Sequence, residues 1–167
     1  IEDLSACARQ KPQNLEAILW ERAQLYEILG DTESMLTDLD YLVRSDGPEA
    51  ASALVMQGKF YLFNERIDQA LANALQAVDK SPDSPAAHRF LADVYVTFQM
   101  VTNAIESLEN VVRLAPDNAH DHYVLGNILS KSDRKAEAIA CYTKAAEVDP
   151  SWWRPLAARA TLNARVN

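Results

Sequence analysis

The chain has 167 residues, of which 49% are hydrophobic and 24% are charged, so it has enough apolar material for a sizeable core and is not of disordered composition. Only four glycines are present, which argues against a turn-rich β-sandwich or barrel. Sixteen Lys and Arg against 24 Asp and Glu give a net charge of -8, and this acidic balance disfavours nucleic acid as a partner.

A 34-residue period organises most of the chain. Pro48, Pro82, Pro116 and Pro150 follow one another at this spacing. Small residues recur in the same register, at Gly58, Ala92 and Gly126 and again at Ala70, Ala104 and Ala138. A supersecondary unit repeated in this way predicts an array in which neighbouring units stack to bury a continuous core.

In chain order the period predicts six elements. They are the second half of an upstream unit at 1–15, with its helix from Leu4 to Pro12, four whole units at 16–50, 51–84, 85–118 and 119–152, and a capping helix at 153–167. In the last whole unit His122, Leu125, Gly126 and Leu129 fall at i, i+3, i+4 and i+7, one face of an α-helix. The stretch from Ala138 to Val148 repeats this pattern, so each unit holds two helices, and we expect nine to ten helices and no strand.

The sequence also predicts where the helices begin and end. Ser84 precedes Pro85 and Asn118 precedes Ala119, which are patterns typical of a helix N-cap. Each period proline is expected just beyond a helix C-terminus, where it stops the helix without breaking it.

This pattern resembles the tetratricopeptide repeat family. Its signature is kept best in the last whole unit, by His122, Leu125, Gly126, Leu129, Ala138, Tyr142, Ala145 and Pro150. The first unit departs most, with Met35 and Leu42 where alanine is usual. The resemblance implies an all-α fold, a right-handed α-solenoid of helix-turn-helix repeats.

The resemblance also implies a concave groove lined by the first helix of each unit, which takes a peptide or helix of a partner protein. The groove positions that we single out are Trp20, Lys59, Phe63, Arg89, Asp93, Tyr123, Asn127 and Lys131. Its first half is apolar and its second half is polar, which matches a ligand with an apolar anchor and a polar or acidic end. The alternative for Trp20 and Phe63 is packing on neighbouring helices, and for Lys59 and Lys131 it is solvation.

One subtype of the family clamps a C-terminal carboxylate with Lys, Asn and Arg at fixed groove positions. In one register those positions hold Trp20, Gln24, Met56, Ala86 and Phe90, and starting one unit later they hold Val55, Lys59, Phe90, His120 and Val124. Neither set supplies the cations that a carboxylate needs, so a receptor for that kind of tail is disfavoured.

The sequence offers no active site or cofactor site that we recognise. It lacks a Gly-rich phosphate loop, HExxH, CxxC and an EF-hand loop. His120 and His122 point apart on a helix, with His122 as a packing residue, and Asp38 and Asp40 are expected to be solvated. Cys141 is expected to be a buried, inert thiol. We therefore expect no enzyme activity and no cofactor.

The remaining expectations concern location and assembly. Cys7 and Cys141 are too few for a disulfide framework, and neither a signal peptide nor a span of roughly 20 apolar residues is visible. We expect a cytoplasmic location, with the periplasm or another compartment possible for a fragment. The chain begins at Ile1, which fits a processed protein or a piece of a larger one.

The predicted capping helix is basic. Residues 151–167 contain Arg154, Arg159 and Arg165 and no acid, a charge of +3. We expect Leu156 and Ala160 to cover the last unit, as the end of a solenoid requires. The sharper hypothesis is that Trp152, Trp153 and the arginines dock on the acidic body of a second copy.

Together these features predict a protein-interaction scaffold. The alternatives are a structural or self-assembly module, or the targeting arm of a larger enzyme or of a secretion or assembly protein.

Overall fold

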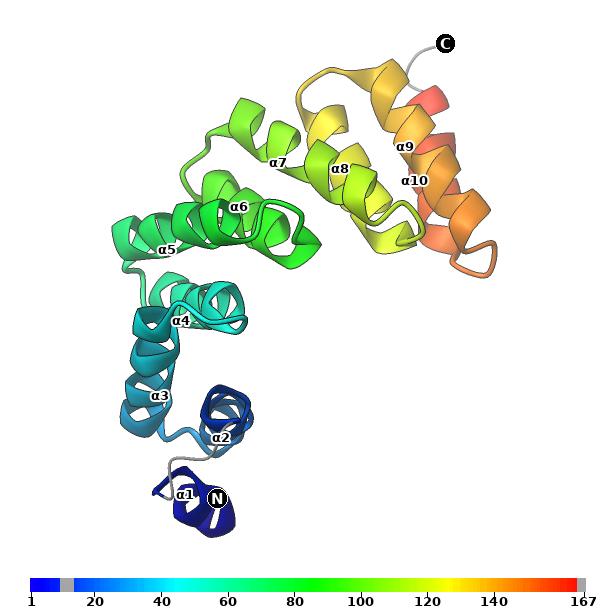
Figure 1. Cartoon of the computed structure of the whole chain (residues 1–167). Helices are drawn as coiled ribbons and strands as arrows, with labels where there is room; N and C mark the ends of the chain where they lie inside the picture. The colour runs from blue at the N-terminus through cyan, green and yellow to red at the C-terminus, as the bar shows by residue number, and fades with distance from the viewer. Residues whose placement is uncertain (10–13, 165–167) are drawn as a thin grey trace. The chain divides into compact units, whose positions relative to one another are not determined.

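The structure, a computed structural model, describes residues 1–9 and 14–164. These residues form α-helices and no β-strand, which confirms the predicted all-α helical-repeat fold (Figure 1). The ten helices are α1 (Glu2–Arg9), α2 (Leu15–Leu29), α3 (Thr32–Ser45), α4 (Ala50–Phe63), α5 (Ile67–Lys80), α6 (Pro85–Thr97), α7 (Val101–Leu114), α8 (Ala119–Lys131), α9 (Lys135–Val148) and α10 (Trp153–Asn163). Repeat boundaries and superhelical handedness stay predictions, and Pro12 and Arg165 lie outside the described residues.

The helices group into two compact units, Ile1–Pro82 (unit 1) and Asp83–Asn167 (unit 2). Within each unit a helix packs mainly on the helices that precede and follow it in the chain. Unit 1 has a core around Leu19, Leu39 and Met56 that also takes in Met35 and Leu42, the residues that depart from the repeat signature. Unit 2 has a core around Ile105, Leu108, Leu125, Leu129 and Tyr142, and Leu162 of α10 closes it.

The turns between the two helices of each repeat share one backbone conformation. Gly30, Glu65, Gln99 and Asp133 all have positive φ, between 59° and 74°, and the last three are 34 residues apart. The amide of the residue after each of them donates to the carbonyl five residues before that amide, in the last turn of the preceding helix. The pairs are Asp31 to Tyr26, Arg66 to Tyr61, Met100 to Tyr95 and Arg134 to Leu129. This left-handed C-terminal cap is the usual way to end a helix, and glycine adopts it most easily.

The expected helix starts and stops are confirmed. Ser84 Oγ accepts the amide of Ala87, and Asn118 Oδ1 accepts the amides of His120 and Asp121. Pro82, Pro116 and Pro150 each lie two residues beyond the end of a helix. None of the described helices combines the length and the hydrophobicity that crossing a membrane requires.

Candidate protein-binding surface

The most exposed apolar side chains of unit 1 gather where α2 and α4 end. Phe63, the last residue of α4, is 88% exposed, and Ile28 and Leu29 near the end of α2 are 79% and 69% exposed. A pocket of about 560 Å³ opens between these two helix ends, and Glu27, Lys59 and Phe63 line it together with Tyr26 and Phe60. We call Glu27, Ile28, Leu29, Lys59 and Phe63 the α2/α4 patch.

Two of the three candidate groove residues of unit 1 therefore meet at one pocket, and the third does not. Lys59 and Phe63 belong to the α2/α4 patch, whereas Trp20 packs against the core of unit 1 beside Leu15 and Tyr26. Trp20 is partly buried, whereas Phe63 is strongly exposed, and the role of both in a groove stays a prediction.

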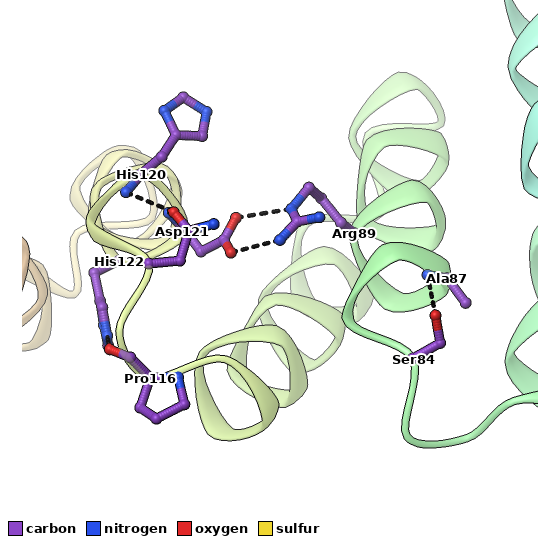
Figure 2. Close-up of polar contacts among 8 residues, drawn as sticks. Ser84, Ala87, Arg89, Pro116, His120, Asp121 and His122 are labelled. Atoms are coloured by element: carbon purple, nitrogen blue, oxygen red, sulfur yellow. Dashed lines mark hydrogen bonds and ion pairs between the residues drawn. The ribbon is translucent and has the colours of Figure 1, made fainter.

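Arg89, a candidate groove cation of unit 2, is held in an ion pair between two first helices. Its Nε and Nη2 donate to the two carboxylate oxygens of Asp121 at 2.8 and 2.6 Å (Figure 2). Asp121 is only 1% exposed, so Arg89 on α6 neutralises a buried charge on α8. The hydrogen bonds to Asp121, together with its charge, raise the pKa of Arg89.

Sequence reasoning missed Asp121, although the repeat contained a signal. The residues 34 and 68 positions earlier are Ala87 and Ala53, both fully buried. A carboxylate at a position that is otherwise a buried alanine requires a partner, because an unpaired buried charge is strongly destabilising.

The expectation that Asp38 is solvated is wrong. Asp38 is 3% exposed and accepts Nε and Nη2 of Arg22 at 2.7 and 2.5 Å, between α2 and α3. Asp40 is exposed, as expected, and accepts a hydrogen bond from Gln57 at 2.6 Å.

The Arg22–Asp38 pair occupies a position that recurs in the repeat. The two residues are 16 apart, and so are Gln57 and Asn73, whose side chains share a 2.9 Å hydrogen bond. In the two later repeats the corresponding pairs are Leu91 with Ser107 and Leu125 with Cys141. The residue pair at this repeat position therefore changes along the chain, from an ion pair to a neutral hydrogen bond and then to leucine opposite serine or cysteine.

The histidines of α8 separate as expected. His122 is buried and one of its ring nitrogens lies 2.8 Å from the carbonyl oxygen of Pro116, so it is a packing residue with a hydrogen-bond partner. His120 is exposed and is directed away from the Arg89–Asp121 pair (Figure 2).

Aromatic contacts involve two other candidates of unit 2. Asn127 accepts a 2.9 Å hydrogen bond from the hydroxyl of Tyr142, and the ring of Tyr123 lies 5.8 Å from that of Tyr142. Trp152 adds an edge contact to Tyr123 at 4.9 Å between ring centroids and stacks on His120 at 5.9 Å. Burial raises the pKa of Tyr142.

The last two candidates lie on the surface of unit 2. Asp93 is exposed one turn after Arg89 on α6, and its charge contributes to the raised pKa of Arg89. Lys131 is exposed at the last residue of α8.

The inward and outward faces of α10 differ from the prediction. Pro155 and Leu162 are buried and Ala158 packs against the core of unit 2, whereas Leu156 and Ala160, which were expected to cover it, are exposed. Trp152 packs within its own chain, and only Trp153 is exposed, at 67%.

Cys141 has the features of an unreactive thiol. It is half-buried on α9, and burial, together with the charges of Glu137 and Glu109, raises its pKa to about 11. Because the thiolate is the nucleophile, a high pKa suppresses its reactivity near neutral pH.

Two sequence profiles of the tetratricopeptide repeat match adjoining segments, residues 55–119 and residues 119–152. The chain belongs to the tetratricopeptide repeat family. Comparison with curated protein sequences gives no significant match.

Solved tetratricopeptide repeat structures share this fold at low sequence identity. MamA from Desulfovibrio magneticus RS-1 is 20% identical with a TM-score of 0.73, over 90% of this chain and 84% of that one. A tetratricopeptide repeat protein from Parabacteroides merdae is 17% identical with a TM-score of 0.77, over 88% of this chain and 58% of that one. The first such domain of Spaghetti (RPAP3), bound to the HSP90 peptide SRMEEVD, is 17% identical with a TM-score of 0.65, over 72% of this chain and 95% of that one.

Proposed function

We propose that the chain is a non-catalytic protein-interaction scaffold that binds a peptide or helix of a partner protein. The observation that carries this proposal is the α2/α4 patch, where the strongly exposed Phe63 lines a pocket and the exposed Ile28 and Leu29 belong to the helix end that borders it. Contiguous exposed apolar surface of this kind marks interaction sites, because leaving it in water is unfavourable. An intracellular location is part of the proposal and rests on the sequence.

The patch suits a ligand segment with an apolar anchor. A volume of about 560 Å³ lies within the range of roughly 300–1,000 Å³ found for ligand pockets. Tyr26, Phe60 and Phe63 provide aromatic walls, and aromatic side chains dominate binding energy at interfaces. Glu27 and Lys59 carry opposite charges at the same pocket, so they favour one orientation of a polar ligand backbone or side chain.

The proposed ligand differs from the HSP90 peptide SRMEEVD that is bound to the RPAP3 domain. In the first register, the positions that would hold the cations of a carboxylate clamp contain Trp20, Ala86 and Phe90, and Met56 occupies one of its asparagine positions. Trp20 packs against the core and Met56 is buried, so neither presents a polar group to a ligand. An apolar anchor with a polar flank fits this chain better than a terminal carboxylate.

In unit 2 the proposal assigns Arg89 a positioning role. Its guanidinium is engaged by Asp121, so it aligns α6 and α8 rather than reading ligand charge. Asp93 on α6 and Lys131 on α8 are exposed polar residues in unit 2, and Tyr123 and Asn127 on α8 are partly exposed.

Selection of random twelve-residue peptides on the immobilised chain tests the proposal. We expect this selection to yield peptides that bind the chain. Phe63→Ala should reduce the binding free energy of the tightest of them by about 1–3 kcal/mol, as the loss of an interface anchor does. Lys59→Glu should weaken them as well, because it reverses a charge at the pocket. Leu75→Ala is the matched control, since Leu75 is an exposed apolar residue on α5 that does not line the pocket. Peptides that bind all four chains equally would show that another surface is used.

Self-assembly is the second candidate function, and the exposed apolar face of α10 favours it. The same surfaces are compatible with a targeting arm of a larger protein. Whether the same gene encodes further domains decides that alternative.

A further inference from the structure

Helix α10 carries a second apolar stripe that none of the described residues of unit 2 covers. Trp153, Leu156, Ala157 and Ala160 fall at i, i+3, i+4 and i+7, and all four are exposed, with Trp153 at 67% and Leu156 at 41%. The opposite side of the helix packs on unit 2 through Pro155, Ala158 and Leu162. A helix that is apolar on both faces is expected to be buried on both.

The stripe also has a charge pattern. Arg154 is exposed beside Trp153 in the first turn, where the unpaired amides of a helix N-terminus add positive partial charge. Arg159 donates to Thr143 at 3.1 Å and so belongs to the packing within the chain. The N-terminal end of α10 therefore combines an exposed indole with a positive field.

The α2/α4 patch has the complementary character. Both α2 and α4 end there, so two helix C-termini contribute negative partial charge. Glu27 lines the pocket, Asp31 lies between two residues that line it, and Lys59 is the opposing cation. Unit 1 as a whole has 14 acidic and seven basic residues, a net charge of -7.

We propose that α10 of one copy docks on the α2/α4 patch of a second copy, with Trp153 as the anchor of the contact. The proposal rests on the proposed function, because it assigns a partner to the same patch. Apolar surface meets apolar surface in this arrangement, and the positive N-terminal turn of α10 meets the negative helix ends of unit 1. The occupant is a second copy because this chain itself contains a segment with both properties.

The contact joins two different surfaces, so it is heterologous. Each copy keeps one free α10 and one free patch after pairing, and assembly continues into rings or open-ended chains. The exposed charges make the association weaker at high ionic strength, since the Debye length falls from about 10 Å at 0.1 M salt to about 3 Å at 1 M.

The test measures molar mass by sedimentation equilibrium as a function of chain concentration and salt. We expect a mass that rises with concentration toward about 100 µM, corresponding to micromolar to millimolar affinity, and falls with added salt. Trp153→Glu and Phe63→Glu should each weaken the association at least tenfold, with Leu75→Glu on α5 as the unaffected control. Circular dichroism checks that each variant is folded, and Ala160→Glu replaces Trp153→Glu if that variant is not.

Mixing the two interface variants separates this arrangement from a symmetric one. Trp153→Glu retains an intact patch and Phe63→Glu retains an intact α10, so the mixture should form a dimer that grows no further. A mixture that stays monomeric overturns the head-to-tail contact, and so does a wild-type chain that is monomeric at low salt or an assembly that Phe63→Glu leaves intact.

The two proposals fail differently. A monomeric chain whose selected peptides still depend on Phe63 would overturn self-docking and leave the binding function standing. An assembly that depends on Trp153 while no peptide uses Phe63 would overturn both the peptide site and its proposed occupant.

Discussion

Truncating either side of the Arg89–Asp121 pair should destabilise unit 2 by clearly different amounts. Arg89→Ala leaves the carboxylate of Asp121, 1% exposed, without its partner. Breaking a buried pair in this way costs about 3–5 kcal/mol. Asp121→Ala instead leaves a guanidinium that is partly exposed and can turn to water.

Asp121→Ala should lower the free energy of unfolding by about 1–2 kcal/mol. It removes two charge-assisted hydrogen bonds and an acidic residue from the first turn of α8, but it also removes the desolvation of a buried carboxylate. The new alanine matches Ala87 and Ala53 at the equivalent repeat positions. The double variant should have nearly the same free energy of unfolding as Asp121→Ala, because neither of them contains the unpaired buried carboxylate.

Urea unfolding followed by circular dichroism measures these differences. Because the chain has two compact units, the transitions are fitted separately and the m-values are compared before free energies are assigned. Equal costs for the two single variants, or a larger cost for Asp121→Ala, would refute the view that Arg89 chiefly neutralises a buried charge.

Three further outcomes follow from local geometry. Gly126→Ala should destabilise the chain by about 1–3 kcal/mol in urea unfolding despite its better helix propensity, because the added methyl group would lie 2.7 Å from the ring of Tyr142; a stabilised variant would contradict this. Gln99→Gly should stabilise the chain by about 0.5–1 kcal/mol, since φ is 59° there and a side chain is disfavoured at that angle. A midpoint of thermal unfolding that is unchanged or lower would count against it. With its pKa raised to about 11, Cys141 in a Cys7→Ser background should react with iodoacetamide at pH 8 about a hundredfold more slowly than in the urea-unfolded chain; equal rates would show a normal thiol.

The repeat fold was predictable from the sequence because its determinants are local and recur. Helix period, caps and terminating prolines each act within a few residues, and a 34-residue repeat supplies several copies of each. The bulky slot of His122 was predicted from this register, although its hydrogen bond to Pro116 was not.

The buried ion pairs were not predicted because they depend on which side chains face one another across helices. The pattern of its own helix predicts that Asp38 is solvated. In the structure Asp38 is buried, and Arg22 on α2 lies opposite and pairs with its carboxylate. Aligning positions 16 apart within each repeat would have suggested this pair, since Gln57 and Asn73 make the neutral version of it.

The surface residues were predicted only in part, for a related reason. The groove register places Trp20 and Phe63 on the same kind of surface, but Trp20 has core neighbours and Phe63 lies at the end of α4. On α10 the repeat register predicted Leu156 as a covering residue, whereas the helix packs through Pro155, Ala158 and Leu162. Which face of α10 packs depends on the side chains of α9 that it meets, and the repeat register alone does not specify them.

Photo-crosslinking from position 63 is the measurement that tests the central claim, that the α2/α4 patch binds a protein segment. A benzophenone amino acid replaces Phe63 in one chain and Leu75 in a control chain, and adducts formed by the purified chain and with selected peptides are mapped by mass spectrometry. We expect adducts from position 63 that map to one short segment, either in α10 of a second copy or in a selected peptide, and that decrease when Lys59→Glu is added. Adducts of equal yield from position 75, or none from position 63, would contradict the claim.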